Sequence, residues 1–194
     1  MSRKLFILVL AFSAVLLFSS VAMAAPRVDP DGMTIDAGLQ VNWASAGVVG
    51  DLNMPIGKVG LRVIAELGYM WLGYWGYGSG MDLGLTGTVM YPVLQEKEFE
   101  LGVYGGLRVG YDHDFYMGLA VGLAVEAPIN SQWTVMGELM YAPGIYIDET
   151  GVYPAWNHGG YGIYGIYELN ADYTLNFGVR SIGLLPGFTV GLTF

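Results

Sequence analysis

Residues 187–194 read Gly-Phe-Thr-Val-Gly-Leu-Thr-Phe. Successive side chains of a β-strand point to opposite faces, so this stretch predicts a strand with two contrasting sides. One side carries only glycine and threonine, and the other carries only the apolar residues Phe188, Val190, Leu192 and Phe194. A strand that is apolar on one side and small or polar on the other is typical of the wall of a transmembrane β-barrel.

The same period of two recurs along the chain and predicts ten strands. They cover residues 35–43, 48–54, 59–69, 81–91, 99–109, 115–126, 133–141, 161–169, 173–180 and 187–194. The stretch 48–54 is the weakest of them. If residues 44–54 form only a loop and one other pair is misread, the count falls to eight, so ten strands is the prediction and eight the alternative.

Charged residues inside these strands all fall on the side that is not apolar. A charge facing lipid at mid-depth costs about 2–4 kcal/mol, which explains why the apolar side carries none. Because an open sheet edge cannot exist in hydrocarbon, we expect an all-β, closed, antiparallel transmembrane barrel. The predicted lumen residues are Asp36, Asp51, Arg62, Glu66, Asp82, Glu100, Arg108, Glu126, Glu138, Glu168 and Arg180.

Aromatic residues stand near the ends of the apolar sides, as the aromatic girdles of a barrel do. They are Trp43, Tyr69, Trp71, Tyr111, Phe115, Trp133, Tyr141, Tyr161 and Tyr173.

The composition agrees with an exported membrane protein. Charged residues make up 13% of the chain, about half the usual fraction for a globular domain, and there are no cysteines for disulfides or thiolate metal sites. The one long apolar run, 5–21, follows Arg3 and Lys4 and precedes Ala22-Met23-Ala24. This is the pattern of a secretory signal peptide cleaved after Ala24; the alternative is a retained helical anchor.

We therefore expect a signal peptide at 1–24, a periplasmic segment at 25–32 and a barrel at 33–194. Loss of the first 24 residues leaves six basic and 17 acidic residues, a net charge of −11. A chain this acidic is not expected to bind nucleic acid through a basic surface.

Turn-forming residues set the expected topology. Short turns at 55–58, 94–98, 128–132 and 170–172 are assigned to the periplasm. Segments 44–47, 73–80, 112–114, 143–160 and 182–187 are assigned to the extracellular side. Both termini are then periplasmic and the number of strands is even.

Phe194 and the alternating apolar residues before it resemble the signal that the outer-membrane barrel-assembly machinery reads. The resemblance implies that Phe188, Val190, Leu192 and Phe194 guide insertion, with the assembly machinery, lipid and lipopolysaccharide as partners. Residues 52–57 (Leu-Asn-Met-Pro-Ile-Gly) and 137–143 (Gly-Glu-Leu-Met-Tyr-Ala-Pro) are similar to segments of the YfaZ-type outer-membrane proteins. This chain differs from that family in an additional central hairpin and in lacking acidic, Asn-rich loops.

The lumen charges allow two interpretations. They form a structural network, since unpaired burial of charge is costly, or they line a narrow cation-preferring pore. Inward Tyr104, Tyr116, Tyr164 and Met70 are expected to narrow the lumen further.

Chemistry is not evident elsewhere. Asp112-His113-Asp114 and His158 allow the hypothesis of an outer-membrane hydrolase, but a solvated polar turn is the simpler interpretation. The Gly-Tyr-Trp-Gly-Tyr-Gly stretch at 73–78 is interpreted as an interfacial hairpin tip, and binding of a hydrophobic or sugar ligand is the alternative. We expect a barrel of structural or small-solute-passage type, with no enzyme activity, metal or cofactor.

Overall fold

The computed structural model describes residues 32–71, 79–156, 159–182 and 185–194. Its regular structure consists of twelve strands, and no helix of these residues is long and apolar enough to cross a membrane. The strands are β1 (Thr34–Val41), β2 (Ser45–Ile56), β3 (Val59–Met70), β4 (Gly80–Gln95), β5 (Glu100–Asp112), β6 (Asp114–Pro128), β7 (Trp133–Tyr141), β8 (Gly144–Asp148), β9 (Gly151–Ala155), β10 (Gly159–Glu168), β11 (Thr174–Ile182) and β12 (Leu185–Thr193).

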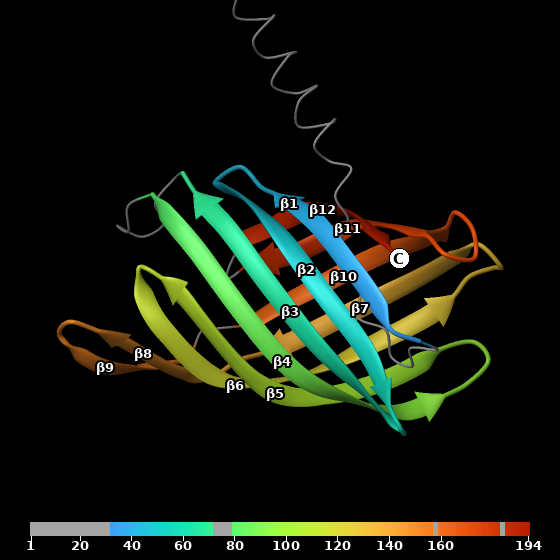
Figure 1. Cartoon of the computed structure of the whole chain (residues 1–194), viewed down its shortest axis with the longest axis horizontal. Helices are drawn as coiled ribbons and strands as arrows, with labels where there is room; N and C mark the ends of the chain where they lie inside the picture. The colour runs from blue at the N-terminus through green and yellow to red at the C-terminus, as the bar shows by residue number, and fades with distance from the viewer. Residues whose placement is uncertain (1–31, 72–78, 157–158, 183–184) are drawn as a thin grey trace, which may run out of the picture.

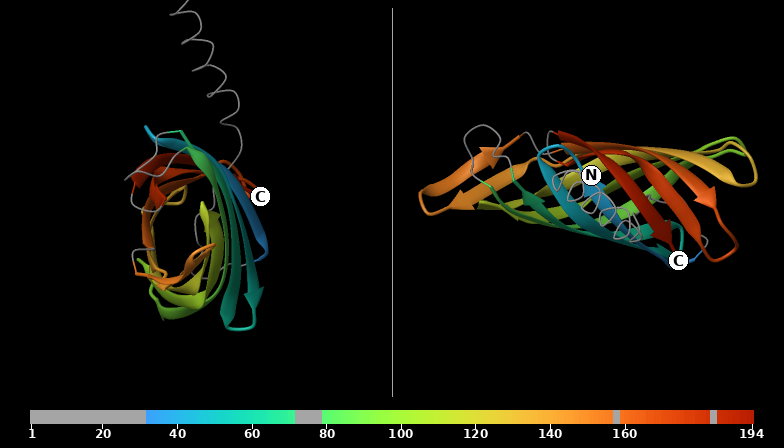
Figure 2. Two further views of the ribbon diagram at one scale, coloured as in Figure 1. Left: turned by 90° about the vertical axis from the view of Figure 1, so that its left-hand side faces the viewer. Right: turned by 90° about the horizontal axis from the view of Figure 1, so that it is seen from above.

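Ten of these strands close into an antiparallel barrel. Their order around the ring is β1-β2-β3-β4-β5-β6-β7-β10-β11-β12, and β12 pairs back with β1 (Figures 1 and 2). At this seam the Ile35 amide donates to the Phe194 carbonyl at 3.0 Å, and the Phe194 amide returns a bond of 3.1 Å. The predicted count of ten is confirmed, and the eight-strand alternative is wrong because β2 is a full strand of 12 residues.

The other two strands form a hairpin, β8–β9, that extends the wall. β8 continues β7 after a break at Ala142 and Pro143, and it pairs with Phe115–Gly118 of β6. The hairpin projects from the barrel at the end opposite the start of β1 and the end of β12 (Figure 1). The prediction of a loop over residues 143–160 is therefore wrong for 144–155, where pairing to β6 gives the backbone a partner.

The two ends of the barrel differ. Short turns join β2 to β3, β4 to β5, β6 to β7 and β10 to β11 at the end where β1 begins and β12 stops. We call this the periplasmic end and the opposite one the extracellular end, as in bacterial barrels. Asn130 and Asn170 each accept two backbone N–H bonds from the turns that they begin, which fixes two of these short connections.

The alternation predicted from the sequence is present in the walls. On β6, for example, Leu119, Val121 and Leu123 are exposed on the outer face, whereas Ala120 and Ala124 are buried inside. All nine residues predicted for the aromatic girdles are exposed. The predicted signal peptide, the segment 25–31 and the aromatic stretch 73–78 lie outside the described residues.

Candidate functional site: the charged lumen

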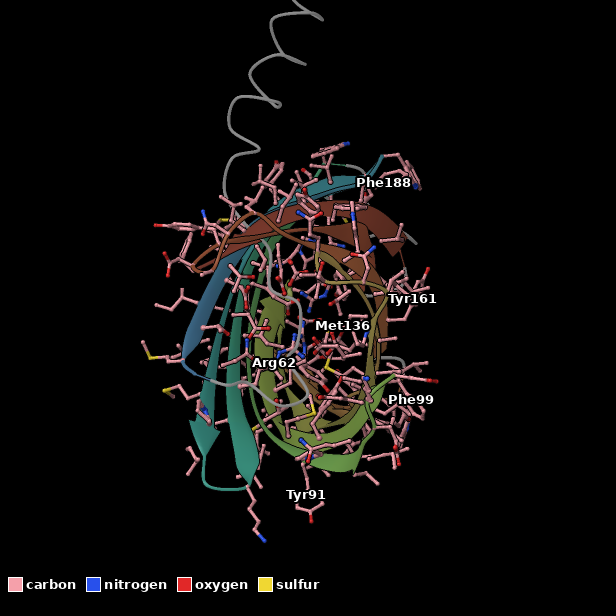
Figure 3. All side chains as sticks on the ribbon, turned by 90° about the vertical axis from the view of Figure 1, so that its right-hand side faces the viewer. Arg62, Tyr91, Phe99, Met136, Tyr161 and Phe188 are labelled. Carbon is pink, nitrogen blue, oxygen red and sulfur yellow. The ribbon has the colours of Figure 1, made fainter. Side chains whose placement is uncertain are left out.

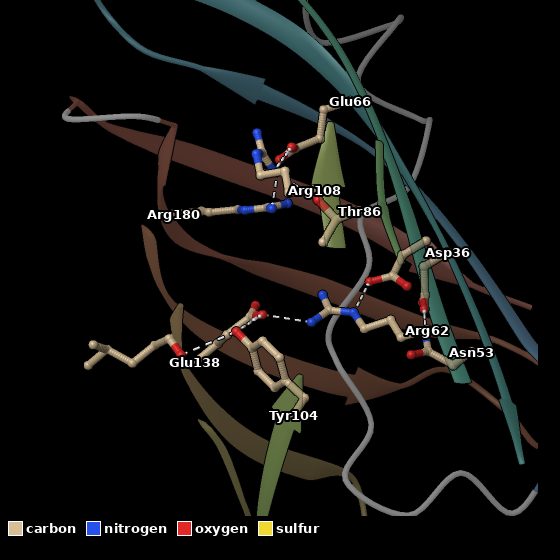
Figure 4. Close-up of polar contacts among 11 residues, drawn as sticks. Asp36, Asn53, Arg62, Glu66, Thr86, Tyr104, Arg108, Glu138 and Arg180 are labelled. Carbon is tan, nitrogen blue, oxygen red and sulfur yellow. Dashed lines mark hydrogen bonds and ion pairs between the residues drawn. The ribbon is translucent and has the colours of Figure 1, made fainter. Parts of the chain in front are cut away.

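The lumen gathers polar side chains from distant parts of the chain (Figures 3 and 4). Every second residue of each wall strand points inward, so charges that are far apart in sequence meet in three layers. We describe them from the periplasmic end to the extracellular end.

The first layer is centred on Asp36 of β1. Its carboxylate accepts hydrogen bonds from the Asn53 amide, at 3.2 Å, and from the Thr193 hydroxyl. Asn176 donates to Thr193 at 2.9 Å and extends the layer to β11. All four side chains are buried, and the two donors that Asp36 meets in this layer are neutral.

The second layer is centred on Arg62 of β3, which is 2% exposed. Its Nε donates to Asp51 Oδ2 at 2.6 Å, and its Nη1 donates to Glu138 Oε1 at 2.6 Å. The Tyr104 hydroxyl donates to the same Glu138 oxygen at 2.9 Å. Since β3 and β7 are four strands apart in a ring of ten, the Arg62–Glu138 pair crosses the lumen.

The third layer is centred on Glu66, which lies between two arginines. Arg108 Nη1 lies 2.5 Å from Glu66 Oε2, and Arg180 Nη2 lies 2.7 Å from Oε1. Arg108 also donates to the Thr86 hydroxyl at 3.0 Å, and the Gln40 amide donates to the Arg180 carbonyl at 3.0 Å. The Glu66–Arg180 pair joins β3 to β11 and crosses the lumen in the other direction.

Apolar side chains fill the lumen around the second layer. Met136, Tyr164 and Ile166 pack together from β7 and β10, and Met90, Tyr104 and Ala124 pack together from β4, β5 and β6. Near the extracellular end, Tyr116 is 2% exposed and its hydroxyl donates to the Ala142 carbonyl. Met70, also assigned to the lumen from the sequence, is half-buried near the end of β3.

Seven of the eleven charged residues singled out in the sequence take part in these layers. The other four lie at the ends of the barrel. Glu100 and Glu126 are cross-strand neighbours, half-buried at the periplasmic end, and Glu168 ends β10 with an exposed side chain. Asp82 lies near the extracellular end, opposite Asp112.

The sequence did not identify the neutral partners of the charges. Asn53, Asn176, Thr193, Thr86 and Gln40 complete the network, and each stands on the inward parity of its strand. The only sequence signal for these residues was their position on the inward-facing side of each strand. That position does not predict which inward polar residues meet, because their meeting depends on the stagger of the strands.

The C-terminal residues lie on the lipid-facing wall. Phe188, Val190 and Phe194 are exposed, and Leu192 is half-buried. Tyr173 packs edge-on against Phe194, with ring centroids 6.4 Å apart. Their role in assembly stays a prediction.

His113 occupies a one-residue hairpin tip between β5 and β6, with φ at 60°. Its ring packs over Gly80, where an added Cβ would lie 2.6 Å from the ring. His158 lies outside the described residues. Within the described part of the chain, no group of three His, Cys, Asp or Glu residues is arranged to hold a metal ion.

The β8–β9 turn carries a polar cluster of its own. The Asp148 carboxylate accepts from the Thr150 hydroxyl at 2.8 Å, from the Thr150 amide at 2.6 Å and from the Gly151 amide at 2.9 Å. These bonds, led by that of the Thr150 hydroxyl, hold the pKa of Asp148 below its ordinary value.

A cavity lies above the third layer, toward the extracellular end. The cavity is partly open to solvent. The charged residues Glu66, Arg108, Glu138 and Arg180 line it, together with small residues such as Gly160 and Ser181. We call this cavity the vestibule.

No protein-family model and no curated protein sequence matches the chain. Among solved structures, the outer membrane protease OmpT from Escherichia coli is similar, with a TM-score of 0.54 at 10% identity over 85% of this chain and 97% of that one. The KdgM porin aligns with a TM-score of 0.47 at 11% identity, over 83% and 98% of the two chains. Outer membrane phospholipase A from Escherichia coli aligns with a TM-score of 0.38 at 12% identity, over 86% and 97%.

At these identities the likeness concerns the fold alone. Together with the closed ten-stranded wall and its apolar outer face, it places the protein in the bacterial outer membrane as a β-barrel. A fold of this kind does not by itself select an activity.

Proposed function

We propose that this protein is a structural outer-membrane barrel whose lumen is closed to solutes at mid-depth. The observation that carries the proposal is the ion pair that Arg62 makes across the lumen with Glu138, braced by Asp51 and Tyr104. Closure is supported by two ion pairs that cross the lumen in different directions and by the apolar residues packed around the first pair. A small barrel of this size is filled by its inward side chains, as expected from the link between strand number and diameter.

A narrow cation-preferring pore is the second candidate, because acids outnumber arginines in the lumen. Against it, the seven charges of the three layers make hydrogen bonds or ion pairs with other lumen side chains, which lowers the number available to a passing ion. Planar-bilayer recordings of the refolded protein separate the two. We expect a silent bilayer, and stepwise cation-selective currents from the unaltered protein would refute closure.

A control variant shows that the recordings can detect an opened lumen. The triple substitution Arg62→Ala, Tyr104→Ala and Met136→Ala removes the central side chains from β3, β5 and β7. If this variant refolds, judged by heat-modifiable migration on a gel, we expect it to conduct where the parent does not.

The proposal includes no catalytic activity. It is supported by the position of His113, which lies at the tip of a tight hairpin with its ring over Gly80. A hydrolase that uses His113 or His158 would lose its activity when both are replaced by glutamine. Hydrolysis of phospholipid or peptide by the refolded protein, abolished by the double replacement, would refute this part.

Two further proposals concern family and partners. Residues 52–57 and 137–143 support a relationship to the YfaZ-type proteins, and the exposed row Phe188, Val190 and Phe194 supports recognition by the barrel-assembly machinery. The apolar outer wall would contact lipid and lipopolysaccharide.

A further inference from the structure

The third lumen layer has more positive than negative charge. Arg108 and Arg180 share one carboxylate, that of Glu66, so the triad carries a net charge of +1. Sharing of this kind leaves guanidinium N–H groups that can donate to something else, since each arginine has five donors.

One of these donors is buried without a partner. Arg180 is 5% exposed, and its Nη1 has no hydrogen-bond partner among the described residues. Arg180 lines the vestibule. An unsatisfied buried guanidinium N–H costs free energy, so an oxygen acceptor that enters the vestibule would relieve that cost.

The neighbouring strand β10 leaves room for a ligand beside Arg180. An added Cβ at Gly160 would meet no atom closer than the Ser181 carbonyl oxygen at 3.4 Å. On the other side, Gly84 lets the triad lie flat against β4. A Cβ there would be 2.8 Å from Glu66 Oε2 and 3.1 Å from Arg108 Nη2. The Arg108 guanidinium is therefore level with Gly84.

Negative charge stands one inward row above the triad. Asp82 is the next inward residue of β4 after Gly84, about 7 Å along the strand. It is the cross-strand partner of Asp112, so two carboxylates face each other at this level. Like charges directly opposite are unfavourable, and neither makes an ion pair with Lys or Arg in the described part of the chain, although His113 borders Asp112 in the chain.

Glu138, the other carboxylate that lines the vestibule, is already bonded to Arg62 and Tyr104. The vestibule therefore has the positive Glu66 triad at its floor, and the carboxylates of Asp82 and Asp112 stand one row above it, at the rim. We propose that the vestibule binds a small zwitterion, with its carboxylate on Arg180 and Arg108 and its ammonium group toward Asp82 and Asp112. A ligand with only a negative charge would be attracted by the arginines at the floor but repelled by the carboxylates at the rim. A ligand with only a positive charge would be attracted at the rim but repelled at the floor. Only a ligand with both charges makes favourable contacts with the arginines at the floor and with the carboxylates at the rim.

The experiment uses the arginines as reporters. After residue 24 the chain has four, Arg27, Arg62, Arg108 and Arg180, so ¹⁵N-arginine labelling of the refolded protein gives few guanidinium Nε–H signals. The probes are 4-aminobutyrate and its two halves, butyrate and butylammonium. We expect 4-aminobutyrate to shift the Arg180 and Arg108 signals saturably, butyrate to shift them at higher concentration, and Arg62 to respond least because it does not line the vestibule.

Variants separate the two ends of the site. Arg180→Lys keeps the charge but removes the forked donor, and we expect about fivefold weaker binding of 4-aminobutyrate. Asp82→Asn with Asp112→Asn should remove the preference for 4-aminobutyrate over butyrate while leaving butyrate binding intact or stronger. Each variant is compared with the parent only after its heat-modifiable migration confirms a folded barrel.

Three results would overturn the inference. They are the absence of saturable shifts at Arg180 in the unaltered protein, equal affinities for 4-aminobutyrate and butyrate, and an undiminished preference in the double Asn variant. Binding is measured without a bilayer, so a conducting barrel that still binds the zwitterion would refute closure of the lumen and leave this site standing.

Discussion

Arg62 of β3 and Glu138 of β7 lie 76 residues apart in sequence and form a 2.6 Å ion pair across the lumen. Both side chains are buried, so neither charge is compensated by water. Desolvation of two ions is repaid only if their geometry is good and their remaining atoms are bonded. Asp51 accepts a hydrogen bond from Arg62 Nε and Tyr104 donates one to Glu138 Oε1, which makes the four side chains a unit rather than two independent pairs.

This coupling gives the first prediction. Arg62→Met leaves Asp51 and Glu138 buried without their cation, and we expect it to lower the free energy of unfolding by about 3–5 kcal/mol. Urea denaturation in lipid vesicles, followed by tryptophan fluorescence, measures the loss.

The matched control removes the carboxylates as well. Adding Asp51→Asn and Glu138→Gln to Arg62→Met should restore most of the lost stability, because no uncompensated charge remains. A triple variant that is as unstable as Arg62→Met would contradict the view that charge balance holds this layer.

A second prediction concerns the tyrosine that braces the pair. Tyr104→Phe removes the hydroxyl that donates to Glu138 Oε1 at 2.9 Å, and should cost about 1–3 kcal/mol of unfolding free energy. Tyr111→Phe is the control on the same strand, since Tyr111 faces outward and is 49% exposed. Equal effects of the two changes in the same urea titration would argue against a specific role for the Tyr104 hydroxyl.

The alternation of side chains was sufficient to predict the wall of the barrel. Along residues such as 187–194 it reports directly on which face meets lipid, because a lipid-facing charge is costly at every strand. The parity of Arg62 and Glu138 within their strands therefore assigns both to the lumen. Their pairing was not predictable, since it depends on the tilt and stagger of strands that lie on opposite sides of the ring.

Two other features escaped prediction for physical reasons. Residues 144–155 resemble a loop, with Pro143, Gly144, Gly151 and Pro154 interrupting the pattern, but β6 offers an unpaired edge that turns them into a hairpin. The apolar residues Ile64 and Met136 stand on the otherwise polar inward parity of their strands, where alternation alone predicts no apolar packing. They fill the lumen around Arg62 because a barrel of this width has a packed interior.

A third prediction tests how closely the wall strands approach each other. Gly106 of β5 has no room for a side chain, because an added Cβ would lie 1.9 Å from the Gly87 carbonyl oxygen. Gly106→Ala must therefore shift the backbone, and we expect a loss of about 1–3 kcal/mol. The neighbouring Gly105 has no atom within 4 Å of an added Cβ, so Gly105→Ala should be neutral or slightly stabilising. The temperature at which heat-modifiable migration is lost compares the two, and a larger effect at Gly105 would contradict the register of β4 and β5.

A fourth prediction concerns pH and the β8–β9 turn. Hydrogen bonds from Thr150 and Gly151 lower the pKa of Asp148 in the folded turn relative to its ordinary value of 3.8. A depressed folded pKa stabilises the turn at pH values above the unfolded pKa, and this contribution is lost as pH falls through the folded pKa. The amide chemical shifts of Thr150 and Gly151 should therefore titrate with a midpoint below 3.8. Asp148→Asn keeps an acceptor oxygen and should abolish the titration while the turn persists; a midpoint above 3.8 would show that the bonds do not favour the charged form.

The final prediction tests which face of the wall meets the hydrocarbon. Leu107 lies near the middle of β5, faces outward and is 61% exposed, while Tyr111 lies on the same face near the extracellular end of the strand. An arginine at mid-depth costs about 2–4 kcal/mol and one near the interface about 0–1 kcal/mol. Leu107→Arg should therefore lower the free energy of unfolding in lipid vesicles much more than Tyr111→Arg. In detergent the difference should shrink, because a micelle deforms around a charge more readily than a bilayer. Equal losses in vesicles would mean that the two positions do not differ in depth, and that the outer face of β5 does not cross the membrane as its tilt and length imply.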